Sequence, residues 1–418
     1  MQHVINWIAL AEILGPRSHL LRPLLAHFKG PEEIFAADEA ALRVAIPDIG
    51  VGTLSSILHK RAHENAEYYA KWCYRNHVRV LTYDSPDYPA CLRDIDEPPA
   101  VLYCRGKLPA LDKRLAVGVV GTRKADAYGE QVAYKLSFEM AAAGAVIVSG
   151  LAEGIDGLAS IAALNAGGDT IAVLGCGIDL VYPKQHTRLS AEVAERGTLL
   201  TEFAPGTMPN GWNFPMRNRL ISALSSAVLV VEAGEKSGAL ITARYAVVQG
   251  KPLFAVPGDI TSPRSAGTNR LLSDGALPAL CAEDMLSYFQ FLYRDAIRLS
   301  YLPEAMQYSG LTPEALRPYG LRMTLDERPA PEEKPRREKR ERRREKEKAP
   351  AVAEKADPDV SSLTPRQKEI FAMIPEGSFS VDALTAGGVP VSEAVSTLTV
   401  FEIYGLIHSI PGGMFEKN

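Results

Sequence analysis

The sequence predicts an α/β protein built around a Rossmann-like, doubly wound parallel sheet. Between residues 106 and 285, six short apolar segments alternate with five segments of helical character. This order is expected when helices cover both faces of a parallel sheet. Polar, glycine-rich loops follow several of these strands, and ligands of such sheets bind at the carboxyl ends of the strands. The strands are predicted at 115–120, 145–149, 170–175, 198–201, 227–232 and 252–256, and the helices at 128–143, 155–166, 184–196, 216–224 and 239–249.

Residues 1–105 are predicted to form a helical N-terminal domain and a connector. Apolar residues recur at helical spacing over 5–14, 20–28 and 34–44. The segment 46–52 (IPDIGVG) then precedes another helix, which resembles a helix-hairpin-helix in a SAM-like domain. Such a hairpin can offer backbone N–H groups to a phosphate. A plain helix–helix connection explains the pattern equally well, and both interpretations stay open.

Residues 286–360 are predicted to be a charged linker. Its centre, 331–350, carries ten Lys or Arg and six Glu without an apolar stripe, which indicates disorder or a solvated helix. Such a segment serves as a spacer, and a weak electrostatic contribution to DNA binding is the alternative.

Residues 361–418 are predicted to fold as a winged helix. Thr364 and Pro365 form a helix start, a second helix follows Ser380, a third spans 391–401, and 406–410 with 414–415 form a small β-wing. The third helix lacks the Arg and Lys side chains that bind phosphates. A structural or protein-contact role therefore fits this domain as well as DNA binding does.

The composition limits the class of protein. The net charge is −4 and 46% of the residues are hydrophobic, so a nucleic-acid site must be a local patch on a globular protein. The five cysteines include no C-x-x-C pair, which argues against disulfides and zinc and favours the cytoplasm. We find neither a targeting segment nor a stretch long and apolar enough to span a membrane.

Two loops of the central region carry phosphate-binding features. Gly121, Thr122 and Arg123 follow the first predicted strand, where the glycine permits a tight turn and the arginine offers a fork suited to phosphate. Ser149 and Gly150 open a second glycine-rich turn after the next strand. Neither loop has the G-x-G-x-x-G pattern, so the sequence predicts no dinucleotide cofactor, and no other cofactor or metal.

Two further segments extend the predicted site. Phe214, Arg217, Asn218 and Arg219 lie at a helix start and combine cations with a ring on which a base can stack. One of the two arginines could instead be a buried ion-pair partner. Lys236, Ser237 and Gly238 begin another helix, but the glycine that a P-loop has five residues before its lysine is missing, which argues against ATP hydrolysis. The loops at 257–259 and 266–272 complete the rim.

These motifs, in their order and spacing, resemble those of the DprA/Smf family of DNA-processing proteins. The resemblance covers the whole Rossmann-like region, and the flanking domains look like extensions found in some members. It implies a protein without catalytic activity that binds and protects incoming single-stranded DNA during natural transformation, loads the RecA recombinase and forms a homodimer. The phosphate-binding roles implied by the family fall on Gly121–Arg123, on Arg217 and Asn218, and on Lys236–Gly238.

Two other functions compete with this interpretation. A nucleotide phosphoribohydrolase of the lysine-decarboxylase-like type would share the layout and could use Glu153, Asp156, Glu232 or Glu235 as a general acid or base. The Pro-Gly-Gly-x-Gly-Thr motif of those enzymes is missing from this sequence. A transcription regulator with a ligand-sensing Rossmann domain is disfavoured by the third helix of the winged-helix region, which is poor in basic residues.

Overall fold

The computed structural model describes residues 1–319, apart from positions 17 and 61, and most of 365–417, apart from 376, 391–393, 395, 396, 399, 403–405 and 411–413. The chain divides into two compact units, Met1–Pro331 and Glu332–Asn418. Each unit is described by itself.

The N-terminal region contains several short helices, and the span 34–44, predicted as one helix, contains parts of two. Asp38 accepts a hydrogen bond from the backbone N–H of Ala41 and so caps a new helix within the predicted span 34–44. The helices are α1 (Gln2–Leu14), α2 (Leu21–His27), α3 (Pro31–Ala36), α4 (Glu39–Ala45), α5 (Val51–Leu58) and α6 (His63–Arg75). The turn between α4 and α5 occupies the predicted hairpin, and Gly50 stands at the N-cap of α5.

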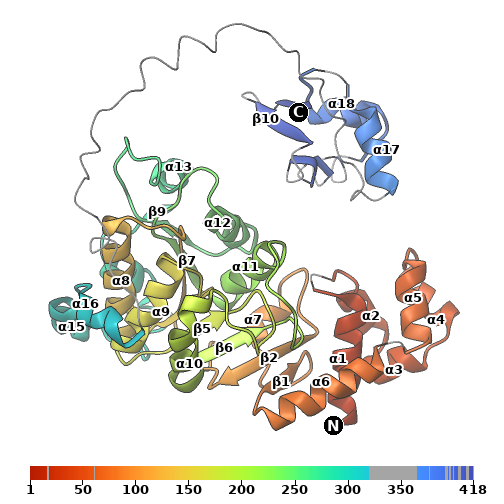
Figure 1. Cartoon of the computed structure of the whole chain (residues 1–418), viewed down its shortest axis with the longest axis horizontal. Helices are drawn as coiled ribbons and strands as arrows, with labels where there is room; N and C mark the ends of the chain where they lie inside the picture. Colours follow the sequence, from red (N-terminus) through yellow and green to blue (C-terminus); the bar gives the residue numbers. More distant parts are fainter. Residues whose placement is uncertain are drawn as a thin grey trace, which may run out of the picture. The chain divides into compact units, whose positions relative to one another are not determined.

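A nine-stranded sheet forms the centre of the first unit, in the order β1-β2-β6-β5-β4-β3-β7-β8-β9 (Figure 1). From β6 to β9 all strands are parallel, and the six predicted strands are all present. The order runs outward in both directions from β3, which places the topological switch point between β3 and β7. The parallel strands are β3 (Ala116–Val120), β4 (Val146–Ser149), β5 (Thr170–Val173), β6 (Thr198–Thr201), β7 (Ala227–Val230), β8 (Leu253–Ala255) and β9 (Leu277–Pro278).

Two strands extend the sheet beyond the region in which the sequence predicts strands. β1 (Arg79–Thr82) pairs antiparallel with β2 (Val101–Gly106), and β2 pairs antiparallel with β6. The short helix α7 (Ala90–Arg93) lies between them in the chain. Residues 79–82 and 101–105, predicted to belong to the helical domain and connector, are therefore part of the central sheet.

Helices cover both faces of the sheet, which confirms the predicted mostly parallel α/β core. One hydrophobic cluster joins one strand face to α8 (Ala127–Ala142), α9 (Ile155–Asn165) and α10 (Thr187–Arg196), which follows the 3-10 turn Lys184–His186. A second cluster joins the other face to α11 (Asn213–Leu224) and α12 (Ala239–Val248). Adjacent residues such as Val119 and Val120 belong to different clusters, as the alternation of a strand requires.

The predicted linker begins later than residue 286. Helices α14 (Ala282–Phe289), α15 (Leu302–Tyr308) and α16 (Pro313–Leu316) follow α13 (Ala266–Ser273), and they belong to the first unit. Ser309 donates a hydrogen bond to the buried carboxylate of Glu139 on α8 at 2.8 Å. These tertiary contacts order a segment whose own sequence has little helical patterning. The charge-rich centre, 331–350, lies outside the described residues.

The C-terminal unit contains α17 (Pro365–Met373), α18 (Val381–Ala386) and an antiparallel hairpin of β10 (Ile407–Ile410) and β11 (Met414–Lys417). Pro365 opens α17 and Ser380 stands at the N-cap of α18, where the sequence predicts both helix starts. Most of the predicted third helix, 391–401, lies outside the described residues, so the winged-helix fold stays a prediction. In the part of the chain that the structure describes, no helix is long and apolar enough to cross a membrane.

Candidate nucleic-acid interface

A cavity of about 840 Å³ opens where the carboxyl ends of β3, β4 and β7 meet the start of α11. We call it the loop cavity. It brings together residues that lie more than 100 positions apart, as expected at the switch point of a doubly wound sheet. Nine of the residues predicted for the site line it: Gly121, Thr122, Arg123, Phe214, Arg217, Asn218, Lys236, Ser237 and Gly238.

The first loop is fixed by its backbone. The N–H of Thr122 donates to the carbonyl of Glu232 at 2.8 Å, and the Thr122 carbonyl accepts from Ile155. A Cβ on Gly121 would lie 2.8 Å from Cβ of Ile155, so only glycine allows the loop to pack this closely on α9. The N–H of Thr122 is therefore not free for a phosphate. The side chain of Arg123 is exposed at the cavity and is the group of this loop that can meet an anion.

Arg217 lies at the floor of the loop cavity and is 3% exposed. It donates to the carbonyl oxygens of Gly150, at 2.7 Å, and of Val173. The carboxylate of Asp156 accepts from the Gly150 N–H at 3.1 Å. Burial lowers the pKa of Arg217 to about 10, against the opposing charge of Asp156, so the guanidinium remains charged at neutral pH. Burial also raises the pKa of Asp156.

An aromatic ring and two guanidinium groups meet inside the cavity. The guanidinium carbon of Arg123 lies 5.0 Å from the ring centroid of Phe214, and that of Arg217 lies 5.9 Å away. Tyr182, 38% exposed, packs on the same ring at 5.2 Å between centroids. Phe214 is half-buried and held by Gly175, where a Cβ would lie 2.8 Å from the ring. The ring therefore has a fixed position and one partly accessible side.

The third loop of the cavity connects β7 to α12 and contributes Lys236, Ser237 and Gly238. Lys236 is exposed and Ser237 precedes α12, where Gly238 takes the N-cap position. The side-chain amide of Asn218 donates to the Gly238 carbonyl at 3.3 Å, and its oxygen accepts from Nε of Arg217 at 3.1 Å. Asn218 thus connects the floor of the cavity to the third loop.

Three of the residues predicted for the site do not line the cavity and instead hold the surrounding structure together: Ser149, Gly150 and Arg219. Arg219 is 2% exposed, does not line the cavity, and forms a bidentate ion pair with Glu202 at 2.6 and 2.7 Å. Ser149 is fully buried and donates to the carbonyl of Val119 at 2.6 Å. Gly150 contributes only the backbone groups that hold Arg217 and Asp156.

Three cationic or aromatic side chains of the cavity were not predicted from the sequence: Lys124, Tyr182 and Arg264. Arg264 donates to the backbone carbonyl of Lys124, and its guanidinium lies 3.9 Å from the carboxylate of Glu232. Arg264 lies in the loop between two segments that were assigned to the rim, and Lys124 directly follows Arg123. Their positions in the sequence could therefore have indicated that both belong to the site. Tyr182 had no such signal in the sequence.

The charge of the loop cavity is strongly unbalanced. Five cationic side chains line it: Arg123, Lys124, Arg217, Lys236 and Arg264. Among the described lining residues, Asp156 is the single carboxylate. Such a cavity attracts an anion, and the fixed ring offers a surface on which a planar group can stack. No group of three or more metal-ligating side chains occurs among the described residues.

Comparison with known proteins identifies relatives of this chain. The family model described as DNA recombination-mediator protein A matches residues 79–290. Protein Smf of Synechocystis is 32% identical over 98% of both chains. The DNA processing protein DprA of Bacillus subtilis is 44% identical over 50% of this chain and 70% of its own.

A solved structure shares the fold. The X-ray structure of DNA processing protein A from Streptococcus pneumoniae superimposes with a TM-score of 0.59 at 30% identity, and the match covers 68% of this chain and 97% of the other. The near full-length match to protein Smf and the family match over half of the chain lead to one assignment: the chain belongs to the DprA/Smf family.

Proposed function

We propose that this protein binds single-stranded DNA in the loop cavity and acts as a DNA-processing protein in natural transformation, without catalysing a reaction. The observation that carries the proposal is the meeting of five cationic side chains and the fixed ring of Phe214 in one cavity. Cations that follow a phosphate backbone, next to rings that stack with bases, are the components of single-strand sites.

The geometry favours unpaired over paired DNA. A base can stack on Phe214 only if it leaves its duplex, because both faces of a paired base are already covered by its neighbours. Contacts between cationic side chains and phosphates carry no sequence information. Binding should therefore be independent of sequence and sensitive to salt.

The proposal is tested by fluorescence anisotropy with the full chain, using single- and double-stranded oligonucleotides of equal length at two salt concentrations. We expect tighter binding to the single strand. Arg123→Ala, Lys236→Ala and Arg264→Ala should each weaken it and lower the salt slope by about one. Arg294→Ala is the matched control, because Arg294 is 78% exposed and follows Tyr293, whose hydroxyl hydrogen-bonds to Ser226 at the amino end of β7, away from the carboxyl ends that form the cavity.

Two results would contradict the proposal. One is equal or tighter binding to the duplex. The other is an equal loss of affinity in the control variant and in the three cavity variants, since this would place the binding surface outside the cavity.

The enzyme alternative is less well supported by the positions of its carboxylates. Asp156 is buried and engaged with Gly150, while Glu232 is 3% exposed beneath the first loop. Of the four candidates, only Asp156 lines the cavity. Incubation with nucleoside monophosphates followed by product analysis distinguishes the functions: release of a free base would establish the phosphoribohydrolase.

We also propose RecA as a partner, on the basis of the family description as a recombination mediator. The full chain should accelerate RecA filament formation on DNA already coated with single-strand-binding protein. Arg123→Ala should reduce this effect because it weakens the DNA contact. The five cysteines, all free in the structure, suit the reducing cytoplasm in which this reaction would occur.

A homodimer is the second proposed assembly. Exposed apolar side chains on α12 and in the loop after β8 support it: Val247, Val248 and Ile260 are 64, 70 and 92% exposed, and Val247 and Ile260 line one hollow of the surface. Exposed apolar side chains that gather in this way mark interaction surfaces. Light scattering should report a dimer for the natural chain and a monomer for Ile260→Asp. Tyr74→Asp, at a position on α6 that is 76% exposed, should remain dimeric.

A further inference from the structure

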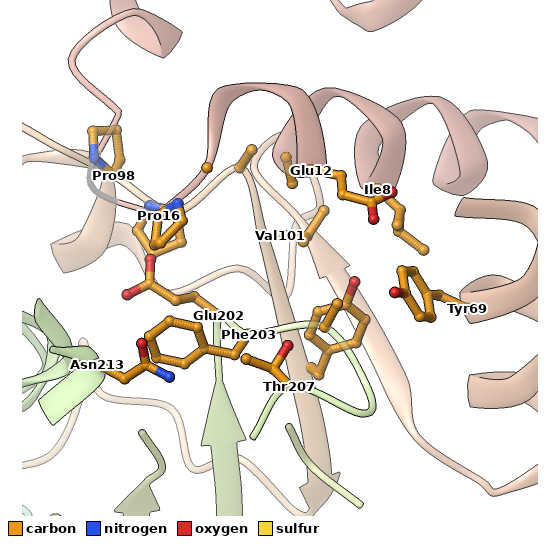
Figure 2. Close-up of a pocket in the computed structure, with 16 residues that line it drawn as sticks. Ile8, Glu12, Pro16, Tyr69, Pro98, Val101, Glu202, Phe203, Thr207 and Asn213 are labelled. Carbon is orange, nitrogen blue, oxygen red and sulfur yellow. The ribbon is translucent and has the colours of Figure 1, made fainter. Parts of the chain in front are cut away.

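A second cavity, of about 330 Å³, lies between the N-terminal helices and the sheet, at β2 and the segment that follows β6. Ile8 and Glu12 of α1 form one side, Tyr69 of α6 another, and Val101 of β2 the floor (Figure 2). Phe203 and Thr207, which follow β6, close it. We call it the α1–sheet cavity. Its residues are not those of the loop cavity, and nothing in the proposed DNA site uses it.

The α1–sheet cavity contains one carboxylate without a cationic partner. Glu12 lies at the rim and accepts a single hydrogen bond, from the amide of Asn65 at 3.2 Å. Glu202 also lines the cavity, but its charge is neutralised by Arg219. Within the described part of the chain, no Lys, Arg or His forms an ion pair with Glu12. Partial burial raises the pKa of Glu12, and a bound cation would reverse this effect.

A tyrosine hydroxyl completes the site. Tyr103 lines the cavity and is 1% exposed. Its hydroxyl forms no hydrogen bond with the described residues and is not one of their fully buried unpaired atoms, so it reaches the open space of the cavity, where a ligand can meet it. Burial, with the nearby charge of Glu12, raises the pKa of Tyr103, so its hydroxyl stays protonated and can accept a hydrogen bond from a cation. Figure 2 shows the carboxylate of Glu12 and the hydroxyl of Tyr69 on the same side of the cavity.

A neighbouring hollow of about 310 Å³ has the same chemistry. It shares Tyr69 and Thr207 with the α1–sheet cavity and adds Tyr68, Trp72 and Asp179. Three aromatic rings around a carboxylate form an arrangement that binds organic cations. The Asp179 carboxylate is held in place by the backbone N–H of Gly206, at 2.8 and 3.0 Å.

We propose that the α1–sheet cavity binds a small protonated aliphatic amine, with its ammonium group between Glu12 and the Tyr103 hydroxyl. The alkyl chain would pack on Ile8, Val101 and Phe203, and a second ammonium group could reach the aromatic hollow at Asp179. A divalent metal ion does not fit, because Mg²⁺ and Ca²⁺ need several oxygen ligands. An anion does not fit either, because the unpaired charges are negative.

The test is isothermal titration of the full, DNA-free chain with butylamine, 1,4-diaminobutane and the neutral 1,4-butanediol. Both amines should bind saturably, the diamine more tightly, and the diol should not bind. Glu12→Gln should weaken amine binding about tenfold, since it removes the charge. Tyr103→Phe should weaken it by a smaller factor. Glu64→Gln, an exposed carboxylate on α6 outside the cavity, is the matched control and should bind like the natural chain.

Three outcomes would overturn the proposal: amine binding that is unchanged in Glu12→Gln, binding of the diol with the affinity of the diamine, or no saturable amine binding at millimolar concentrations. Tyr103 is buried, so its variant could lose stability. Glu12 lies at the rim, where its substitution leaves the core intact, and the test therefore does not depend on Tyr103.

Discussion

The guanidinium of Arg217 occupies the space that a side chain on Gly150 would need. A Cβ built on Gly150 would lie 2.5 Å from Nη2 of Arg217 and 2.5 Å from the Asp156 carboxylate. The position of Arg217 at the floor of the loop cavity therefore requires glycine at position 150. Gly150 was predicted as a phosphate-binding residue, and the structure gives it a position that supports Arg217.

Gly150→Ala should lower both stability and DNA affinity. The methyl group would displace Arg217 from the carbonyls of Gly150 and Val173, at a cost of about 1–3 kcal/mol, as for other overpacked interiors. Thermal denaturation and anisotropy titration measure the two effects. Gly310→Ala is the control, because a Cβ there meets nothing within 4 Å. An unchanged melting temperature for Gly150→Ala would show that the floor relaxes freely.

Arg123→Ala and Arg217→Ala should separate binding from folding. Arg123 is exposed, so its loss should weaken single-strand binding while changing the free energy of unfolding by no more than about 0.5 kcal/mol. Arg123→Lys should recover only part of the affinity, because an ammonium lacks the planar fork.

Loss of Arg217 should destabilise the fold as well. It would remove the cation that acts most strongly on the buried Asp156, and breaking a buried charge pair in this way typically costs about 3–5 kcal/mol. Chemical denaturation of Arg123→Ala and Arg217→Ala under the same conditions measures the difference in their free energies of unfolding. If Arg217→Ala unfolds at the same denaturant concentration as Arg123→Ala, Arg217 has no structural role.

The Arg219–Glu202 pair should contribute to stability and not to DNA binding. Both side chains are at most 3% exposed, and breaking such a pair strands a buried charge, at a cost of about 3–5 kcal/mol. Arg219→Met should therefore lower the melting temperature, and the double variant Arg219→Met with Glu202→Leu should regain most of it. Anisotropy should show near-natural affinity in the double variant; a loss there would return Arg219 to the binding site.

Stability should fall as the pH rises through the range in which Glu232 titrates. Burial, with the charge of Asp126, raises the pKa of Glu232 to about 7 from its ordinary value of 4.5. Between these values the folded chain holds a proton that the unfolded chain has released, so the unfolding free energy decreases with increasing pH, by about 3 kcal/mol at most.

Glu232→Gln should abolish this component of the pH dependence and should be more stable than the natural chain at pH 8. Denaturant titrations at pH 5 and pH 8 measure it. Glu235→Gln, an exposed neighbour, should keep the natural pH dependence. An identical pH profile for Glu232→Gln and the natural chain would show that Glu232 titrates normally.

The parallel core could be predicted because its signals are local. Each strand is a short apolar segment and each loop ends a strand, so the meeting of Arg123, Phe214 and Lys236 follows from the topology. β1 and β2 were missed because Arg79–Thr82 mixes polar and apolar residues, and its place is set by pairing with residues far along the chain, such as Arg79 with Cys104. Residues 302–316 were missed for the same reason, since contacts with α8 and α9 order them.

The positions of Arg217 and Arg219 show that the site prediction lacked information on how α11 packs. Residues two apart on a helix point to different sides, so both arginines could not face one cavity. This signal was in the sequence. Which of the two faces the cavity depends on where α11 packs, and only the structure places Arg217 under Gly150 and Arg219 against Glu202. The position of Tyr182 on Phe214 is likewise a matter of tertiary packing.

The hairpin of β1 and β2 also protects the molecule against strand-by-strand association. Because β2 pairs with Thr198–Thr201, β6 is an interior strand, and the outermost strands are the four-residue β1, which carries Arg79, and the two-residue β9, which ends in Pro278. Short edges that carry a charge or a proline discourage the addition of a foreign strand. A fragment that began at residue 106 would expose the apolar β6 as a new edge and should self-associate, whereas one that began at Arg79 would keep that edge closed.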